Sequence, residues 1–161
     1  LLLALVVAAL TGALWLATPG TELAAALREQ HIVAARDLPA LFAALDLHLK
    51  QGFAVPHHAI RIWNTPESTV SEALKNEVGA QMHPSCGALR HAEAQEWFGE
   101  AAAHLKSFAA IPLTPVHLGG GHTVGLLVLA SEDARRFYPE MGTLYLERLG
   151  QLIGAALTRM A

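Results

Sequence analysis

The chain has 161 residues, of which 53% are hydrophobic and 16% are charged, and its formal net charge is −3. This composition supplies enough apolar material for one core and excludes a disordered chain, which needs low hydrophobicity and high net charge. It also excludes the basic surface with which proteins bind nucleic acid directly, and a single cysteine excludes an internal disulfide.

No charged side chain occurs before Glu22. An apolar run of this length lies at the lower limit for crossing a bilayer, which takes roughly 17–25 residues. The run is rich in alanine, Thr11 and Gly12 interrupt it, and no basic segment precedes it as in a signal peptide. We therefore expect residues 1–17 to form a packed helix, with a membrane span or anchor as the alternative. Residues 1–35 together are expected to be a helical segment that serves as a linker or in dimerisation.

A further helix is predicted over residues 21–35. Pro19 and Gly20 precede it, and both residue types break helices, so the first helix is expected to end there. Thr21 follows the pair directly and is the expected N-cap.

Residues 37–53 show the clearest helix pattern of the chain. Asp37 is the expected N-cap, Pro39 lies in the first turn, and Gly52 is expected to end the helix. Apolar residues recur at the spacing of an amphipathic helix that faces a core; they are Leu38, Leu41, Phe42, Leu45 and Leu49.

The next segment, residues 55–64, alternates in the manner of a strand. Successive side chains of a strand point to opposite faces of the sheet. Ile60 and Ile62 should therefore share one face, and Arg61 and Trp63 the other.

Two short helices are predicted next, with a turn between them. Residues 68–83 suit a helix that is capped by Ser68 or Ser71, and residues 90–100 suit another. The intervening "HPSCG", residues 83–87, contains proline and glycine, which are typical of a turn.

The last third of the chain predicts an antiparallel meander and a long helix. Residues 104–113 and 123–131 are the two best strands, and residues 114–122 supply a short strand and a glycine-rich turn. The uninterrupted apolar run within the later strand favours a central position, covered on both faces. Residues 139–161 form the helix, so the whole chain predicts an α+β fold.

Four motifs of this region carry a family resemblance: "PSCGAL", "SFAAIPL", "GLLVLAS" and "RFYPEMGTLYLERLG". The strand that ends in Pro112-Leu113, the Gly125-Leu126-Leu127 strand and Phe137 before the last helix resemble the second half of a GAF domain. More narrowly, residues 36–160 resemble a proteobacterial GAF-like family that is catalogued as domain of unknown function 484.

The resemblance implies a central antiparallel sheet of five or six strands, with N- and C-terminal helices packed on one face. It implies a small-molecule pocket on the other face, and a bacterial, cytoplasmic signalling module that forms a homodimer through its terminal helices. Members of the family are often encoded beside a tyrosine recombinase, which hints at a protein partner. The resemblance names no ligand or cofactor, and the signature of cyclic-nucleotide-binding GAF domains is absent.

Seven residues are candidates for lining such a pocket. Arg61 could hold an anionic group and Trp63 could stack on a ring, although an exposed arginine packed on a tryptophan is the favoured alternative. The complete candidate set is Arg61, Trp63, His83, Cys86, Trp97, Phe98 and Ser107.

Cys86 raises the question of catalysis. A cysteine nucleophile needs a lowered pKa from a nearby base or a helix N-terminus, and His83 is close in sequence. No second cysteine is present to resolve an oxidised intermediate, so a structural thiol is favoured. A metal site would need two more ligands, for which the scattered histidines show no suitable spacing. We expect no metal and no cofactor.

We therefore expect a non-catalytic module that senses a small ligand or binds a protein as a homodimer. One alternative is a structural dimerisation adaptor without a ligand, whose pocket space is filled by Trp63, Trp97 and Phe98. A further alternative is a redox or thiol enzyme that uses Cys86.

Overall fold

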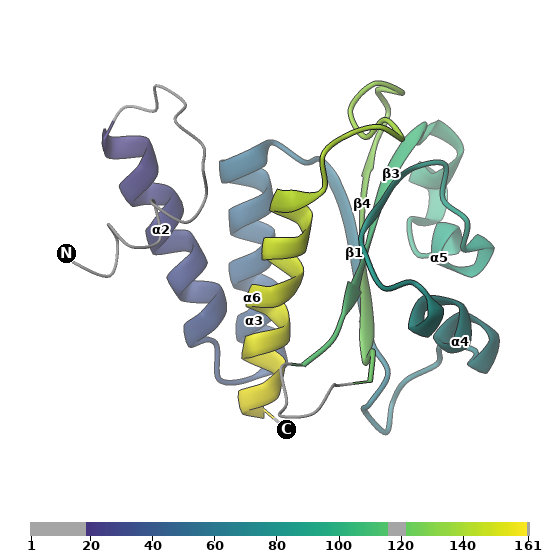
Figure 1. Ribbon diagram of the computed structural model, residues 1–161, viewed down its shortest axis with the longest axis horizontal. Helices are drawn as coiled ribbons and strands as arrows, with labels where there is room; N and C mark the ends of the chain where they lie inside the picture. Colours follow the sequence, from purple (N-terminus) through teal and green to yellow (C-terminus); the bar gives the residue numbers. More distant parts are fainter. Residues whose placement is uncertain (1–18, 116–121, 161) are drawn as a thin grey trace.

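The computed structural model describes residues 19–115 and 122–160, with side chains from residue 24 onward. It shows a mixed α+β fold in which one open antiparallel sheet has helices on both faces (Figure 1). The predicted fold class is confirmed at this level. The predicted helix over residues 1–17 lies outside the described residues.

The sheet has the strand order β1-β4-β3-β2. Its members are β1 (His57–Ile62), β4 (Gly125–Ser131), β3 (Ser107–Leu113) and β2 (Ser85–Gly87), and every neighbouring pair is antiparallel. The described part of the chain thus holds four strands, so the predicted five or six are not confirmed. Of the segment 114–122, where a further short strand was predicted, the described residues are in no strand.

Residues of the two central strands divide alternately between two cores. On β4, Leu127 and Leu129 belong to the first core, and Leu126 and Val128 belong to the second. Every residue of β4 is buried, which explains why this strand is uninterruptedly apolar rather than alternating.

The first core lies between the sheet and three helical elements. These are α2 (Pro19–Ala34), α3 (Leu38–Leu47) with the π-helical turn η1 (His48–Gly52), and α6 (Leu144–Met160). Helix α2 packs on α3 and α6 and lies farthest from the sheet (Figure 1).

The second core lies on the opposite face. It is covered by α4 (Glu72–Ala80), by the short α5 (Ala92–Glu96) and by the 3-10 helix η2 (Gly99–His104). Its buried residues are Val70, Leu74, Val78, Leu89, Ala94, Leu105, Phe108, Ala110, Leu126, Val128 and Ala130.

Two predicted helix caps are confirmed. The Asp37 carboxylate accepts a hydrogen bond of 2.8 Å from the Ala40 amide, and the Ser71 hydroxyl accepts one of 3.2 Å from Leu74. The cap assigned to Thr21 is wrong, because α2 already includes Pro19. Proline is tolerated in the first turn of a helix, where its missing amide hydrogen has no partner to lose.

The turn predicted over residues 83–87 is also wrong. Ser85–Gly87 forms β2, in which Cys86 lies opposite Ala109 of β3. Gly87 has a φ of 112°, which favours glycine, so the tight bend follows the strand rather than replacing it.

The last helix begins at Leu144, five residues later than the sequence predicts. The Thr143 carbonyl accepts a 2.8 Å hydrogen bond from Glu147 in its first turn. Among the helices of residues 19–115 and 122–160, none combines the length and the apolarity needed to cross a bilayer.

Candidate functional site

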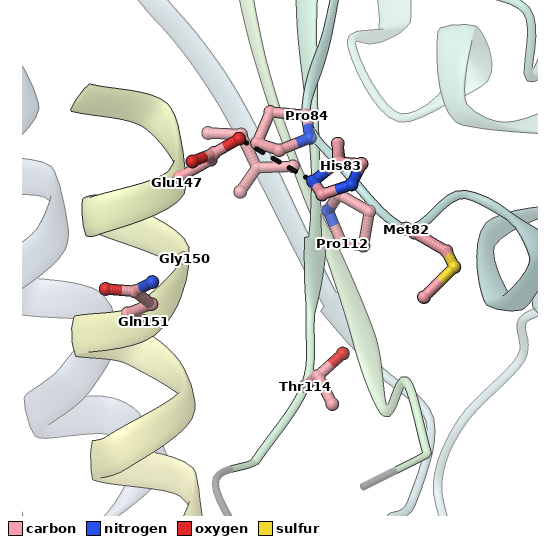
Figure 2. Close-up of a pocket in the computed structure, with 9 residues that line it drawn as sticks. Met82, His83, Pro84, Pro112, Thr114, Glu147, Gly150 and Gln151 are labelled. Atoms are coloured by element: carbon pink, nitrogen blue, oxygen red, sulfur yellow. Dashed lines mark ion pairs between the residues drawn. The ribbon is translucent and has the colours of Figure 1, made fainter. Parts of the chain in front are cut away.

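A cleft of about 300 Å³ lies beside α6 at the end of β3. Figure 2 shows that one wall comes from α6 and that the others come from β3 and the segment before β2. The cleft is lined by Met82, His83, Pro84, Ile111, Pro112, Thr114, Glu147, Gly150 and Gln151.

Two glycines allow α6 to approach the sheet closely here. A Cβ atom on Gly150 would lie 3.0 Å from Ile111 Cγ2, and one on Gly154 would lie only 2.4 Å from the Thr114 carbonyl oxygen. The contact at Gly154 is too short for a side chain because it is made to the backbone, and at Gly150 the Ile111 side chain would have to shift by a few tenths of an ångström. The two glycines therefore allow α6 to lie close to the end of β3 beside the cleft.

The polar groups of the cleft come from both walls. His83 Nδ1 lies 3.6 Å from Glu147 Oε1, a distance that gives an ion pair when the imidazole is protonated (Figure 2). The His83 side chain is 79% exposed, so this pair contributes little to stability. Gln151 follows Glu147 by one helical turn and completes the polar edge of the wall.

A partly buried hydrogen-bond network holds the segment that carries His83. The Gln81 side-chain amide lies 2.9 Å from the His83 carbonyl and 3.1 Å from the Ala110 carbonyl. Its oxygen lies 3.1 Å from Nε2 of His91, and the other ring nitrogen of His91 lies 3.0 Å from Glu77. The network links α4 to β3 and fixes the backbone at the mouth of the cleft.

Only His83 of this cleft was among the residues predicted from the sequence. Glu147 and Gln151 lie in the helix predicted over residues 139–161, but nothing in the sequence identified what their side of the helix meets. Gln81 and His91 carry no sequence signal, because their partners lie on other elements. The polar side chains of the cleft could bind a small polar molecule. The cleft is open to solvent, so a molecule bound there would stay in contact with water.

Four of the other predicted residues lie on the opposite face of the sheet. Trp63, Trp97 and Phe98 pack against the second core, and the Arg61 guanidinium lies 5.1 Å from the centre of the Trp97 ring. Arg61 is exposed, so this pair matches the favoured alternative of an arginine packed on a tryptophan, with Trp97 as the partner.

A second, more open hollow of about 400 Å³ lies at the start of β1. Trp97 and Phe98 border it, but Arg61 and Trp63 do not. Its remaining lining consists of Asp46, Lys50, Pro56, His57 and His58.

Ser107 and Cys86 both make contacts that hold the fold together. The Ser107 hydroxyl donates to the Asp133 carbonyl at 2.6 Å and accepts from the Phe137 amide at 3.3 Å, which fastens the loop after β4. Cys86 is half-buried against the first core, and burial raises the pKa of its thiol. The seven predicted residues therefore lie on both faces and at one end of the sheet and do not share either hollow.

No group of three or more histidine, cysteine, aspartate or glutamate side chains within the described ranges is arranged to hold a metal ion. The structure defines an α+β domain with an open antiparallel sheet, two cores and an open cleft whose lining is partly polar and partly apolar.

This chain belongs to the family described as "Protein of unknown function, DUF484", whose family model matches residues 22–161. The match confirms the narrower of the two resemblances seen in the sequence. A search of curated proteins returned no match.

Proposed function

We propose that this chain is a non-catalytic, GAF-like protein-interaction module that works as a homodimer. The observation that carries the proposal is the filled face of the sheet. The GAF resemblance implies a ligand pocket on the face away from the terminal helices, and in this chain the second core occupies that face.

Partly buried aromatic side chains pack against the second core where the pocket was expected, and two of them, Trp97 and Phe98, also border the open hollow at the start of β1. Phe98 lies 6.3 Å from Phe108 between ring centres, and the Trp63 indole nitrogen donates to the Thr123 carbonyl at 3.0 Å. Trp97 packs against the same core. If the protein is an adaptor without a ligand, these three aromatic side chains are expected to occupy the space of the pocket.

The outer face of α3 supplies a surface for a partner. It exposes Phe42 and Leu47, at 36% and 39% of their surfaces, and Ala43 and the ion pair of Asp46 with Lys50 lie between them on the same side of the helix. Exposed apolar side chains beside charged ones are a feature of the borders of protein interfaces. We therefore assign the proposed dimer contact to α3.

Helix α6 is less suited to this contact than the sequence predicted. Leu149 of this terminal helix is 0% exposed and belongs to the first core. Glutamate at this position would unfold the monomer rather than separate two subunits.

Light scattering tests the proposal. The unmodified chain is expected to have the mass of a dimer, and Leu47→Glu is expected to give a folded monomer because a charge would enter the apolar contact. Met82→Glu is the matched control, since Met82 is 85% exposed on another surface, and it is expected to keep the dimer. A monomeric unmodified chain would overturn the proposal.

Ligand sensing is the second candidate function, and the cleft beside α6 supports it. A molecule that bridges Gln151 and the segment of His83 would contact both the terminal helix and the sheet, and it would favour one arrangement of the two. The test is thermal unfolding in the presence of fractionated metabolites. Stabilisation that disappears in Gln151→Ala supports sensing, and equal stabilisation of both chains contradicts it.

We infer that Cys86 is not a nucleophile, because its raised pKa opposes formation of the reactive thiolate. On the resemblance alone, the bacterial cytoplasm is the proposed location.

A further inference from the structure

The cleft beside α6 opens where the ladder between β2 and β3 ends. Ser85 of β2 pairs with Ala110 of β3, and the same register continued by two residues would place His83 opposite Pro112. Proline has no N–H to donate to a ladder. Strand β2 begins only at Ser85, and the segment of His83 forms a wall of the cleft instead of a longer strand.

The Pro112 carbonyl is an acceptor in this wall. Alternate residues of a strand turn their carbonyls to the same edge, so those of Ala110 and Pro112 both face the side of β2. The Ala110 carbonyl accepts a hydrogen bond of 3.1 Å from the Gln81 side chain, whereas no donor among the described residues bonds to the Pro112 carbonyl. The Pro112 oxygen would lie 3.5 Å from a Cβ on Gly150, which places it against α6.

One carboxylate dominates the charge of the cleft. Of the nine described residues that line it, Glu147 and His83 are ionisable, and none is a lysine or an arginine. Figure 2 shows these two side chains turned toward each other. The Glu147 side chain is 37% exposed, so its carboxylate is accessible to a ligand. Glu147 and Gly150 are three residues apart and share one side of α6, so the carboxylate and the Pro112 carbonyl are two acceptors of one cavity.

Apolar side chains complete the lining. Met82, Pro84 and Ile111 border the cleft, and Met82 is 85% exposed. Methionine is flexible and adapts its shape to what it contacts, and a ligand in the cleft would cover part of its exposed surface. The lining therefore favours a molecule that joins a positively charged donor to a short hydrocarbon chain.

We propose that the cleft binds a small primary amine as its alkylammonium ion. The ammonium group donates to the Glu147 carboxylate and to the Pro112 carbonyl, and its third N–H remains for water. The hydrocarbon chain packs on Met82 and Ile111. An anion would instead face the Glu147 carboxylate without a lysine or an arginine in the lining to offset the repulsion.

This inference rests on the second candidate function, ligand sensing at the cleft, and specifies its ligand class. An ammonium ion held by Glu147 and Pro112 would connect α6 to β3, the two elements whose arrangement a sensed ligand must favour. The outer face of α3 takes no part, so the proposed dimer is tested independently.

Nuclear magnetic resonance of the Met82 and Ile111 methyl groups tests the proposal, because both side chains line the cleft. The probe is n-butylammonium chloride, compared at constant pH with sodium chloride of equal ionic strength. Sodium butyrate is the probe of similar length and opposite charge. We expect saturable shifts of both methyl resonances with butylammonium and none with butyrate.

Glu147→Gln keeps the shape of the side chain and removes its charge. It should weaken the binding of butylammonium by about three- to tenfold, an effect between that of an exposed ion pair and that of a hydrogen bond to a charged group. Glu132→Gln is the matched control, since Glu132 is exposed beyond the end of β4 that pairs with the start of β3, away from the cleft. It removes the same charge and should leave the affinity unchanged.

His83→Ala separates a cation site from an anion site. The imidazole competes with the amine for Glu147, so its removal should preserve or tighten the binding of butylammonium. Saturable binding of butyrate that His83→Ala abolishes would overturn the choice of an amine and leave ligand sensing standing. Equal affinity of the unmodified chain and Glu147→Gln for butylammonium would overturn the proposal, as would the absence of a saturable shift.

Discussion

His48 is a polar side chain in an apolar layer, between the π-helical turn and α6. Its burial is compensated at one ring nitrogen by Tyr145, whose own pKa burial raises. Sequence reasoning placed His48 on an amphipathic helix and gave it no role, because its partner lies 97 positions later. Asp37 and Ser71 were identified correctly, since a cap bonds to an amide only three residues away.

The stability of the protein should depend on pH through His48. Burial lowers its pKa below the ordinary 6.5, with Glu29 opposing this effect and Arg28 adding to it. The unfolded chain therefore binds a proton that the folded chain excludes. The free energy of unfolding should have its highest contribution from His48 above pH 6.5. Below pH 6.5 it should decrease, by at most about 1.4 kcal/mol per pH unit for one proton.

Urea unfolding at several pH values measures this slope. His48→Gln should flatten it, and the slope that is left will include His58, whose pKa burial also lowers. An unchanged slope in His48→Gln would show that another group is responsible.

Cys86 should be a slow thiol. Because burial raises its pKa, alkylation by iodoacetamide at neutral pH is expected to be at least about tenfold slower in the folded chain than in urea, since the thiolate is the reactive species. Mass spectrometry of the modified chain provides the rates. Rapid labelling of the folded protein below neutral pH would instead support the thiol-enzyme alternative.

At the scale of elements, helix α6 shows what periodicity can and cannot supply. The sequence predicted a long helix here, and Leu149 and Ala156 on its apolar face are buried. The role of Gly150 and Gly154 was missed, because small residues on a helix carry no sign of how closely a strand will approach. Strand β2 was missed for a related reason. Only three residues long, it is stabilised by pairing with β3 rather than by its own pattern.

Two glycine-to-alanine substitutions should have opposite effects on stability. Gly154→Ala would place a methyl group 2.4 Å from the Thr114 carbonyl, so α6 must shift and the free energy of unfolding should fall by about 1–3 kcal/mol. A Cβ atom on Gly79 in α4 would have no atom within 4 Å, so Gly79→Ala should raise the free energy of unfolding by about 0.4–1 kcal/mol. Urea unfolding gives both values, and a neutral Gly154→Ala would mean that the contact of α6 with β3 is loose.

At the scale of the molecule, one sheet separates two cores and belongs to both. Adjacent residues of β4 contribute to opposite sides, as Leu126 and Leu127 do, and both are 0% exposed. Loss of either core therefore removes support from the same strand. This arrangement predicts that the described part of the chain unfolds as one unit.

Leu126→Ala and Leu127→Ala test this unity. Each substitution should lower the free energy of unfolding by about 2–5 kcal/mol. In each variant, two spectroscopic probes should report the same unfolding transition. Far-ultraviolet circular dichroism follows the helices, while tryptophan fluorescence in a Trp15→Phe background follows Trp63 and Trp97 beside the second core. Separate transitions would show that the two cores unfold independently.

The sequence by itself determined the fold class, most helices, the three longer strands and the family, because these depend on local periodicity, caps and ordered motifs. The tertiary structure alone decided where the predicted site residues meet. It placed Arg61 and Cys86 on opposite edge strands and opposite faces of the sheet, packed Trp63, Trp97 and Phe98 against the second core, and brought Arg28 to the turn that follows His48. The physical reason is that contacts between distant segments depend on packing distances, which here are set by two glycines on α6 and by the pairing of β3 with β4.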